Sequence, residues 1–131
     1  MTDCRLTIRS RGRGWESNHI LPADMQFSEG SVSIFYKLEG DDCTLTLSPR
    51  RAEQSRSGEV PLRLTFVPGE DTVCIVGTGG LRGGYRIHTD VFNCIFGRAG
   101  VSARIEYFAG DDREHIKLDI RAIAFAAVTP E

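Results

Sequence analysis

The sequence predicts an all-β protein, most simply an antiparallel up-and-down barrel of about eight to ten strands. Most segments alternate apolar and polar residues with a period of two, the spacing of a strand with one dry face and one wet face. Turn-forming residues recur at intervals of roughly ten positions, and no stretch keeps a helical period over ten residues. Consecutive hairpins favour a closed meander over a sandwich, because closure removes the exposed edges of an open sheet.

The N-terminal third is predicted to contain a strand, an ambiguous segment and a hairpin. The apolar face of the first strand comprises Cys4, Leu6 and Ile8. In residues 16–27, Pro22 and a mixed pattern predict either an edge strand or a loop that crosses between strands. Residues 31–48 are predicted to form a hairpin that turns at Gly40, Asp41 and Asp42.

The middle of the chain is less regular. Residues 49–57 are polar throughout and fit either a short strand at the rim or a helical turn. Short strands are expected at residues 62–67 and 72–76, on either side of a Pro68-Gly69 turn. The glycine-rich residues 77–84 are predicted to form a loop of positive-φ glycines. A long strand follows, in which Thr89 and Val91 are expected to share one face.

Residues 100–124 are predicted to form the closing hairpin, and their charges select its register. When Tyr107 is placed opposite Ile116, Glu106 faces Lys117 and Arg104 faces Asp119. A shift of two residues in either direction sets like charges opposite each other. A shift of one residue turns the whole apolar set toward water.

The composition limits the class of protein. The 131 residues fit a single β-barrel domain (residues 1–131), and 40% hydrophobic with 26% charged residues is ordinary for a globular protein. The net charge of −2 gives no general attraction to nucleic acid or to a membrane surface. Because no apolar run is long enough to span a membrane and the N-terminus lacks a signal-peptide core, a cytoplasmic location with reduced thiols is expected.

The residue types that carry chemistry do not form a recognisable catalytic or metal-binding pattern. Cys4, Cys43, Cys74 and Cys94 are dispersed, which favours small buried side chains over a zinc site. The glycine-rich segment lacks the Lys and the following helix of a phosphate-binding loop. The three histidines lie far apart, and no nucleophile elbow is present. We therefore expect no enzyme activity, no cofactor and no metal.

Several short motifs in the middle of the chain resemble a known family when their order is considered. They are Arg56-Ser57-Gly58, Leu64-Thr65-Phe66, Gly69, Thr78 and Ile87-His88-Thr89, with Tyr36-Lys37-Leu38-Glu39, Ile105-Glu106-Tyr107 and Leu118-Asp119-Ile120 extending the match. This order resembles the YwiB-like family of small bacterial β-barrels, whose function is uncharacterised. The resemblance implies a closed, lipocalin-like (calycin-type) barrel. Val76 departs from it, since the family tends to have tyrosine there, and the glycine-rich loop is looser than the family's.

The predicted function is non-catalytic binding of a small, partly apolar molecule in the barrel or its mouth. An eight-stranded barrel is just wide enough to hold one small ligand or to be filled by its own side chains, and both alternatives stay open. A binding barrel needs a cavity of roughly 300 Å³ or more with convergent polar groups. The residues predicted to contact the ligand are Tyr36, Arg56, Phe66, Thr89 and Tyr107.

The alternative function is a protein–protein or polyanion interaction module that acts through the outer face, including as a homodimer. Arginines alternate along the first strand near Trp15, the only tryptophan, and basic residues beside an aromatic suit a polyanion. The members of this stripe are Arg5, Arg9, Arg11 and Arg13, and the apolar residues expected to face outward are Phe108, Ile123 and Phe125. The competing interpretation is a solvated face whose charge is balanced by acids on a neighbouring strand.

Overall fold

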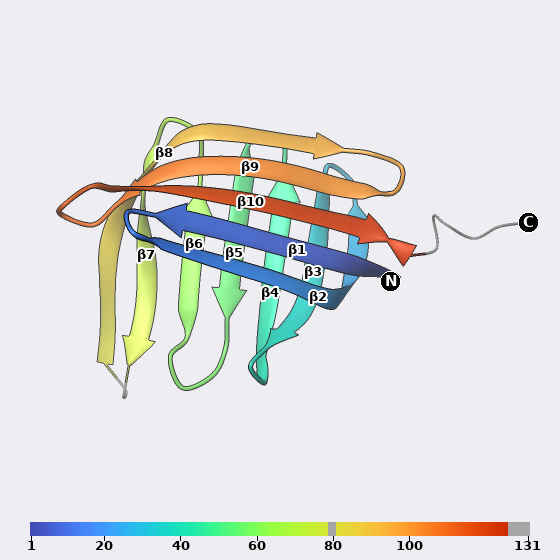
Figure 1. Ribbon diagram of the computed structural model, residues 1–131, viewed down its shortest axis with the longest axis horizontal. Coiled ribbons are helices and arrows are strands. Elements are labelled where there is room, and N and C mark those ends of the chain that lie inside the picture. Colours follow the sequence, from blue (N-terminus) through green and yellow to red (C-terminus); the bar gives the residue numbers. More distant parts are fainter. Residues whose placement is uncertain (79–80, 126–131) are drawn as a thin grey trace, which may run out of the picture.

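The structure, a computed structural model, describes residues 1–78 and 81–125 and is a closed barrel of antiparallel strands. Each strand pairs with the next along the chain, and the last pairs with the first (Figure 1). The strands are β1 (Thr2–Gly12), β2 (Trp15–Ser28), β3 (Ser31–Leu38), β4 (Asp41–Ser48), β5 (Arg51–Arg56), β6 (Leu62–Phe66), β7 (Asp71–Thr78), β8 (Leu81–Phe96), β9 (Gly100–Ala109) and β10 (Glu114–Ala124). The predicted all-β up-and-down barrel is confirmed.

The barrel is flattened into two layers whose strands cross. In Figure 1 the front layer is formed by β9, β10, β1 and the long parts of β8 and β2, which run across the view. The back layer is formed by β3 to β7, which run up and down behind it. β8 forms the upper margin of the front layer and β2 forms its lower margin.

Two strands pass from one layer to the other and so close the barrel. β2 pairs with β1 along nearly its whole length, but it pairs with β3 only from Asp24 to Ser28. β8 pairs with β7 as far as His88, and beyond that point its partner among the described strands is β9. A β-bulge between Thr89 and Val91 marks this corner, as bulges do where a strand bends. The prediction that Val91 shares the face of Thr89 is therefore wrong, and Phe92 takes the inward position.

The structure assigns the two ambiguous segments to strands, and it contradicts the prediction for another segment. Residues 16–27 belong to β2, and most of residues 49–57 belong to β5. The predicted loop at residues 77–84 is wrong for its described part, because β7 continues to Thr78 and β8 begins at Leu81. Gly84 is needed there for close approach, since an added Cβ would lie 2.9 Å from the carbonyl oxygen of Cys74. Gly79 and Gly80 lie outside the described residues.

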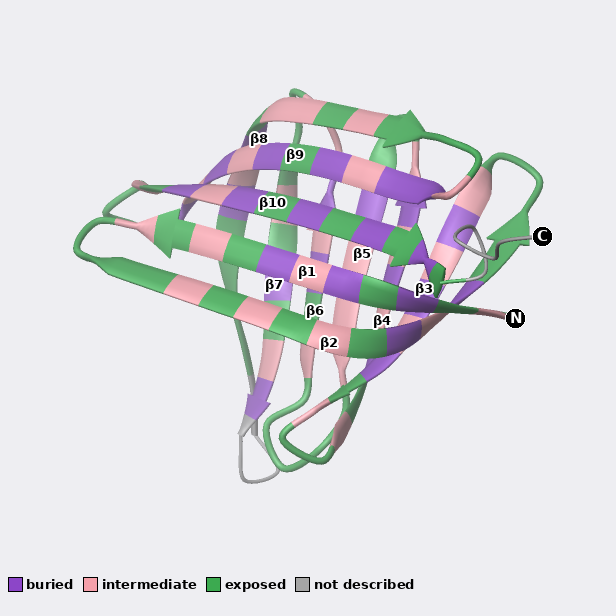
Figure 2. Ribbon diagram, turned by 45° about the vertical axis from the view of Figure 1, so that its right-hand side comes forward, coloured by how far each residue is buried: buried purple, intermediate pink, exposed green. Residues whose placement is uncertain are grey.

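The closing hairpin has the register that its charges predict. Tyr107 lies opposite Ile116, Glu106 opposite Lys117, and Arg104 opposite Asp119. Buried and exposed residues alternate along β9 and β10, as the banded strands of Figure 2 show. The inward set of these two strands is the most continuous part of the core.

The cysteines fit the predicted role of small buried side chains. Cys4, Cys43 and Cys74 are buried and Cys94 is half-buried, all as free thiols. Burial raises the pKa of Cys4 and Cys94 to about 11, so both remain protonated at neutral pH. In the described part of the chain no helix has the length and apolar character to span a membrane. The cytoplasmic location stays a prediction.

Candidate functional site

The inward side chains of the back layer form three rows that become more polar from one end of the barrel to the other. Strand pairing aligns Val32, Leu47, Ala52 and Phe66 in an upper row, all apolar and buried. The middle row is Ile34, Leu45, Gln54 and Leu64. The lower row is Tyr36, Cys43, Arg56 and Leu62. One polar residue thus enters the middle row, and a charged residue enters the lower row.

The front layer has a similar gradient, directed toward its β2 margin. One inward row runs Phe92, Ile105, Leu118, Ser10 and Ser17, and the next runs Cys94, Ala103, Ile120, Ile8 and His19. Both rows are apolar at β8 and polar at β2. Because the lower end of the back layer also lies at the β2 side, the polar groups of the two layers converge there.

A cavity of about 200 Å³ lies where these polar groups meet. Its walls come from seven strands of both layers and combine hydroxyl, imidazole and amide groups with leucine side chains. The lining residues are Ile8, Ser10, Ser17, His19, Leu21, Tyr36, Leu38, Gln54, Leu64, Tyr107 and Leu118. The barrel is therefore neither solid nor widely hollow. The cavity has the convergent polar groups expected of a binding site, but it is smaller than the predicted 300 Å³.

Two tyrosines line this cavity, Tyr36 and Tyr107. The Tyr36 hydroxyl accepts a hydrogen bond from Gln54 Nε2 at 3.3 Å. Tyr107 packs against Phe66, with ring centroids 4.9 Å apart. Burial raises the pKa of Tyr36 and of Tyr107 to about 12, so both hydroxyls stay protonated and able to donate at neutral pH.

On the opposite wall, β2 contributes a serine and a histidine that contact each other. Ser17 and His19 are two residues apart, so they project from the same face of the strand. Ser17 Oγ lies 3.2 Å from His19 Nε2. A nucleophile activated by histidine also needs a third group that orients the ring. Among the described residues, the hydrogen bonds of His19 include no carboxylate, so we interpret this pair as a polar wall of the cavity.

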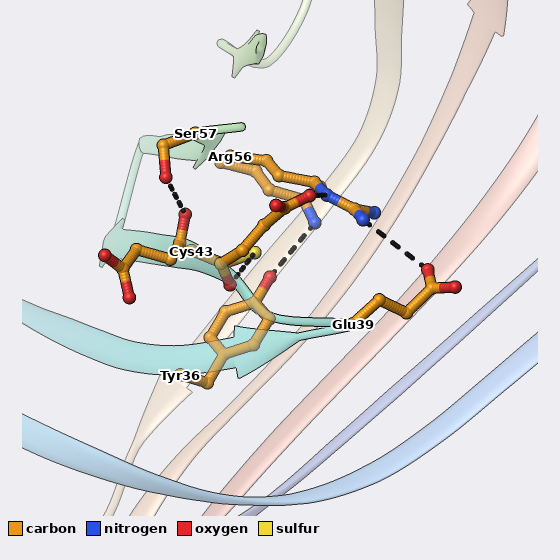
Figure 3. A network of polar contacts seen from close by, with 8 residues as sticks. Tyr36, Glu39, Cys43, Arg56 and Ser57 are labelled. Atoms are coloured by element: carbon orange, nitrogen blue, oxygen red, sulfur yellow. Dashed lines mark hydrogen bonds and ion pairs between the residues drawn. The ribbon is translucent and has the colours of Figure 1, made fainter. Parts of the chain in front are cut away.

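Beside the cavity, at the lower row, an ion pair joins β5 to the β3–β4 turn. Arg56 Nε donates to Asp41 Oδ2 at 2.8 Å, and Arg56 lies 3.5 Å from Glu39 (Figure 3). The hydrogen bond with Asp41 raises the pKa of Arg56. Gly58 permits this arrangement, because an added Cβ would lie 2.5–2.8 Å from the Asp41 carboxylate.

The five predicted ligand-contacting residues fall into two groups. Tyr36 and Tyr107 line the cavity. Phe66 is buried behind Tyr107, Arg56 lines a neighbouring surface hollow with Asp41, and Thr89 is fully buried at the β8 corner. In the described part of the chain, Thr89 Oγ1 has no hydrogen-bond partner. The structure thus brings two of the five together, and ligand contact stays a prediction for all five.

Four polar lining residues were not predicted: Ser10, Ser17, His19 and Gln54. Each interrupts the apolar alternation by which inward positions are recognised, and this loss of pattern is what made residues 16–27 ambiguous. Counting every second residue back from Met25 through Ala23 and Leu21 leads to His19 and Ser17. This two-residue spacing was the available sequence signal that His19 and Ser17 point inward.

A larger hollow, about 850 Å³, lies on the outer surface where β2 and β3 diverge. Phe35 and Phe125 supply apolar surface there, and Asp3, Asp24 and Asp42 supply carboxylates. A hydrogen bond with Asp3 raises the pKa of Asp24. The lining also includes the buried residues Ala23, Cys43 and Tyr36, so the groove reaches the barrel wall, and Tyr36 borders both it and the inner cavity.

Several of the residues proposed for an outer-face interaction already have neighbours within the chain. Arg9 lies opposite Asp119 of β10. Arg11 lies between Glu16 of β2 and Lys117 of β10, so acids balance the arginine stripe only in part. Phe108 stacks on His115 with ring centroids 4.9 Å apart, and Arg113 covers its ring. Ile123 and Phe125 are exposed. Among the described residues, no group of three or more His, Cys, Asp or Glu side chains is placed to hold a metal ion.

Comparison with known proteins supports the fold and does not identify a function. No family model matches the chain, and no curated protein matches it in sequence. The crystal structure of the YwiB protein from Bacillus subtilis is similar, with a TM-score of 0.81 and 15% sequence identity over 94% of this chain and 92% of that chain. The chain therefore has a YwiB-like barrel fold, as the order of its motifs predicted.

Proposed function

We propose that the protein binds a small, uncharged, partly apolar molecule inside the barrel, in the cavity beneath β2. The observation that carries this proposal is the convergence of polar side chains from both layers on one hollow in a core whose other buried side chains are apolar except for Thr89. Ser17 and His19 come from one wall, and Tyr36 and Gln54 from the other. A barrel selected only for stability has no need of polar groups at these inward positions.

The chemistry of the lining indicates the class of ligand. Lys, Arg, Asp and Glu are absent from the described cavity walls, while the hydroxyls, the amide and the imidazole can each donate or accept a hydrogen bond. Such groups suit the hydroxyl, carbonyl or amide of a neutral ligand. Four leucines and one isoleucine offer surface to its apolar part.

The volume limits the size of the ligand. At the roughly 30 Å³ that a water molecule occupies in the liquid, 200 Å³ corresponds to about seven waters, or a mass on the order of 100–200 Da. Pockets for drug-sized molecules measure about 300–1,000 Å³. The ligand is therefore smaller than these, or extends from the cavity into solvent.

The experiment is native mass spectrometry of protein purified without denaturation, compared between two neighbouring variants. We expect an adduct of roughly 100–200 Da that is lost on unfolding. Ser17→Met fills the cavity and should remove the adduct. Asn18→Met, on the opposite face of the same strand, should retain it. Equal adducts in both variants, or no adduct in the parent protein after incubation with its own cell extract, would refute the proposal.

A further inference from the structure

Among the described residues, the upper margin of the front layer, β8 from Val91 to Phe96, is paired on one side only. β7 pairs with β8 as far as His88, and the backbone of Thr89 bonds to Gly69 and Glu70. Beyond the bulge, the described partner of β8 is β9 alone (Figure 2). In an antiparallel strand, alternate residues direct their N–H and C=O groups away from such a partner. This margin therefore presents a row of backbone donors and acceptors.

The residues on this margin favour pairing with another strand. The run is Val91-Phe92-Asn93-Cys94-Ile95-Phe96, with no charge, no proline and no glycine. Ile95 is 69% exposed and Phe96 is 40% exposed. Natural edge strands usually carry charged side chains or proline, which prevent edge-to-edge association. The other margin of the same layer does so, since β2 contains Glu16 and Pro22.

We propose that the protein forms a homodimer in which the β8 margins of two copies pair antiparallel and join the two front layers into one sheet. A two-fold axis makes each margin its own partner, so one unprotected edge satisfies both copies. This interface is independent of the cavity, because Ser17 and His19 lie at the opposite margin.

The alternation of side chains determines the register. Directly opposed residues in a sheet point to the same face. A two-fold axis perpendicular to the sheet must therefore pass between one residue and the same residue of the other copy. An axis at Asn93 sets Val91 of one copy opposite Ile95 of the other, and Asn93 opposite its counterpart. Two amides can hydrogen-bond to each other. An axis at Cys94 would instead set Asn93 opposite Ile95, so we assign the axis to Asn93.

The charges next to this margin do not oppose the pairing. Arg104 and Glu106 of β9 lie beside Asn93 and Val91, and they form an ion pair with each other at 3.6 Å. Each copy thus brings a locally neutral strand to the interface.

The first test measures the mass in solution by analytical ultracentrifugation, for the parent protein and two isoleucine variants. We expect the parent to have twice its chain mass of 14.5 kDa. Ile95→Lys puts a charge on the β8 margin and should weaken dimerisation about tenfold or more. Ile20→Lys is the matched control, since Ile20 is 65% exposed on β2, and it should remain dimeric. A monomeric parent at high micromolar concentration, or equal behaviour of the two variants, would overturn the proposal.

The second test determines the register by disulfide trapping. Cα atoms of directly opposed residues lie about 4.5–5.5 Å apart, within the range that a disulfide spans. Asn93→Cys should therefore form a covalent dimer under mild oxidation, beyond the level of the parent with its native Cys94. Asn18→Cys places an exposed cysteine on β2 and should not. A dimer that persists while Asn93→Cys does not cross-link would show that the two-fold axis does not pass through Asn93.

Discussion

The two margins of the front layer are both strand edges, but they differ in the residues that they carry. In the part of the chain that the structure describes, β2 before its corner and β8 after its corner are each paired on one side only, β2 with β1 and β8 with β9. The β2 margin carries charge and proline, and the inward residues beneath it are polar. The β8 margin carries neither, and the inward residues beneath it, Phe92 and Cys94, are partly buried against the core.

This difference indicates a division of roles between the two ends of the barrel. An edge protected by charge can remain in water, and the polar groups below it can be hydrated or occupied by a ligand. An uncharged edge over an apolar core is satisfied best by another strand. On this basis we expect the β2 side to bind a small molecule and the β8 side to bind a second copy of the chain.

The largest expected effect tests whether the two ends differ in packing. Leu47 is fully buried in the upper row, whereas Leu38 is half-buried and borders the cavity. Leu47→Ala should lower the free energy of unfolding by about 2–5 kcal/mol, because a close-packed site cannot collapse around the lost atoms. Leu38→Ala enlarges an existing cavity and should cost clearly less. Urea denaturation measures both, and equal losses would contradict the distinction between a packed end and an open end.

A smaller effect is expected at the ion pair beside the cavity. Gly58→Ala should cost about 1–3 kcal/mol, because φ is +126° and the new Cβ would displace the Asp41 carboxylate from Arg56. Gly40→Ala is the control, since φ is +86° but nothing lies within 4 Å of the added Cβ. Its cost reports the backbone strain alone. If the two variants are equally destabilised, the Arg56–Asp41 contact does not contribute to holding this end together.

The sequence predicts the parts of the fold where one face is dry along the whole strand. The register of β9 and β10 follows from Glu106, Lys117, Arg104 and Asp119, since a shift of two residues in either direction opposes like charges. Of the polar residues that line the cavity, the sequence predicted only the two tyrosines. Tyr36 and Tyr107 continue the apolar faces of their strands, whereas Ser17, His19 and Gln54 are polar residues at inward positions and remove the pattern. The β8 margin depends on a bulge at residue 90, where one extra residue exchanges the faces, and alternation alone does not locate such a residue.

The smallest effect is expected at the start of the β2 margin, where a fall in pH should loosen the β1–β2 turn. Glu114 of β10 accepts hydrogen bonds from Trp15 Nε1 at 2.6 Å and from the Arg13 backbone N–H at 2.9 Å. The Trp15 bond is the main cause that lowers the pKa of Glu114 below its ordinary value of 4.5. Because the unfolded chain then binds this proton more readily than the folded chain, the stabilisation is complete above the ordinary pKa. It is lost as the pH falls through the lowered one.

Tryptophan fluorescence measures this change directly, since Trp15 is the only tryptophan. We expect the emission of the folded protein to shift below pH 4.5, together with a lower unfolding temperature. Glu114→Gln keeps the size of the side chain but removes the titration, so its emission should be nearly independent of pH. If the Gln variant shows the same acid shift as the parent, the shift comes from another group. The β2 margin would then owe its order to its pairing with β1 rather than to this carboxylate.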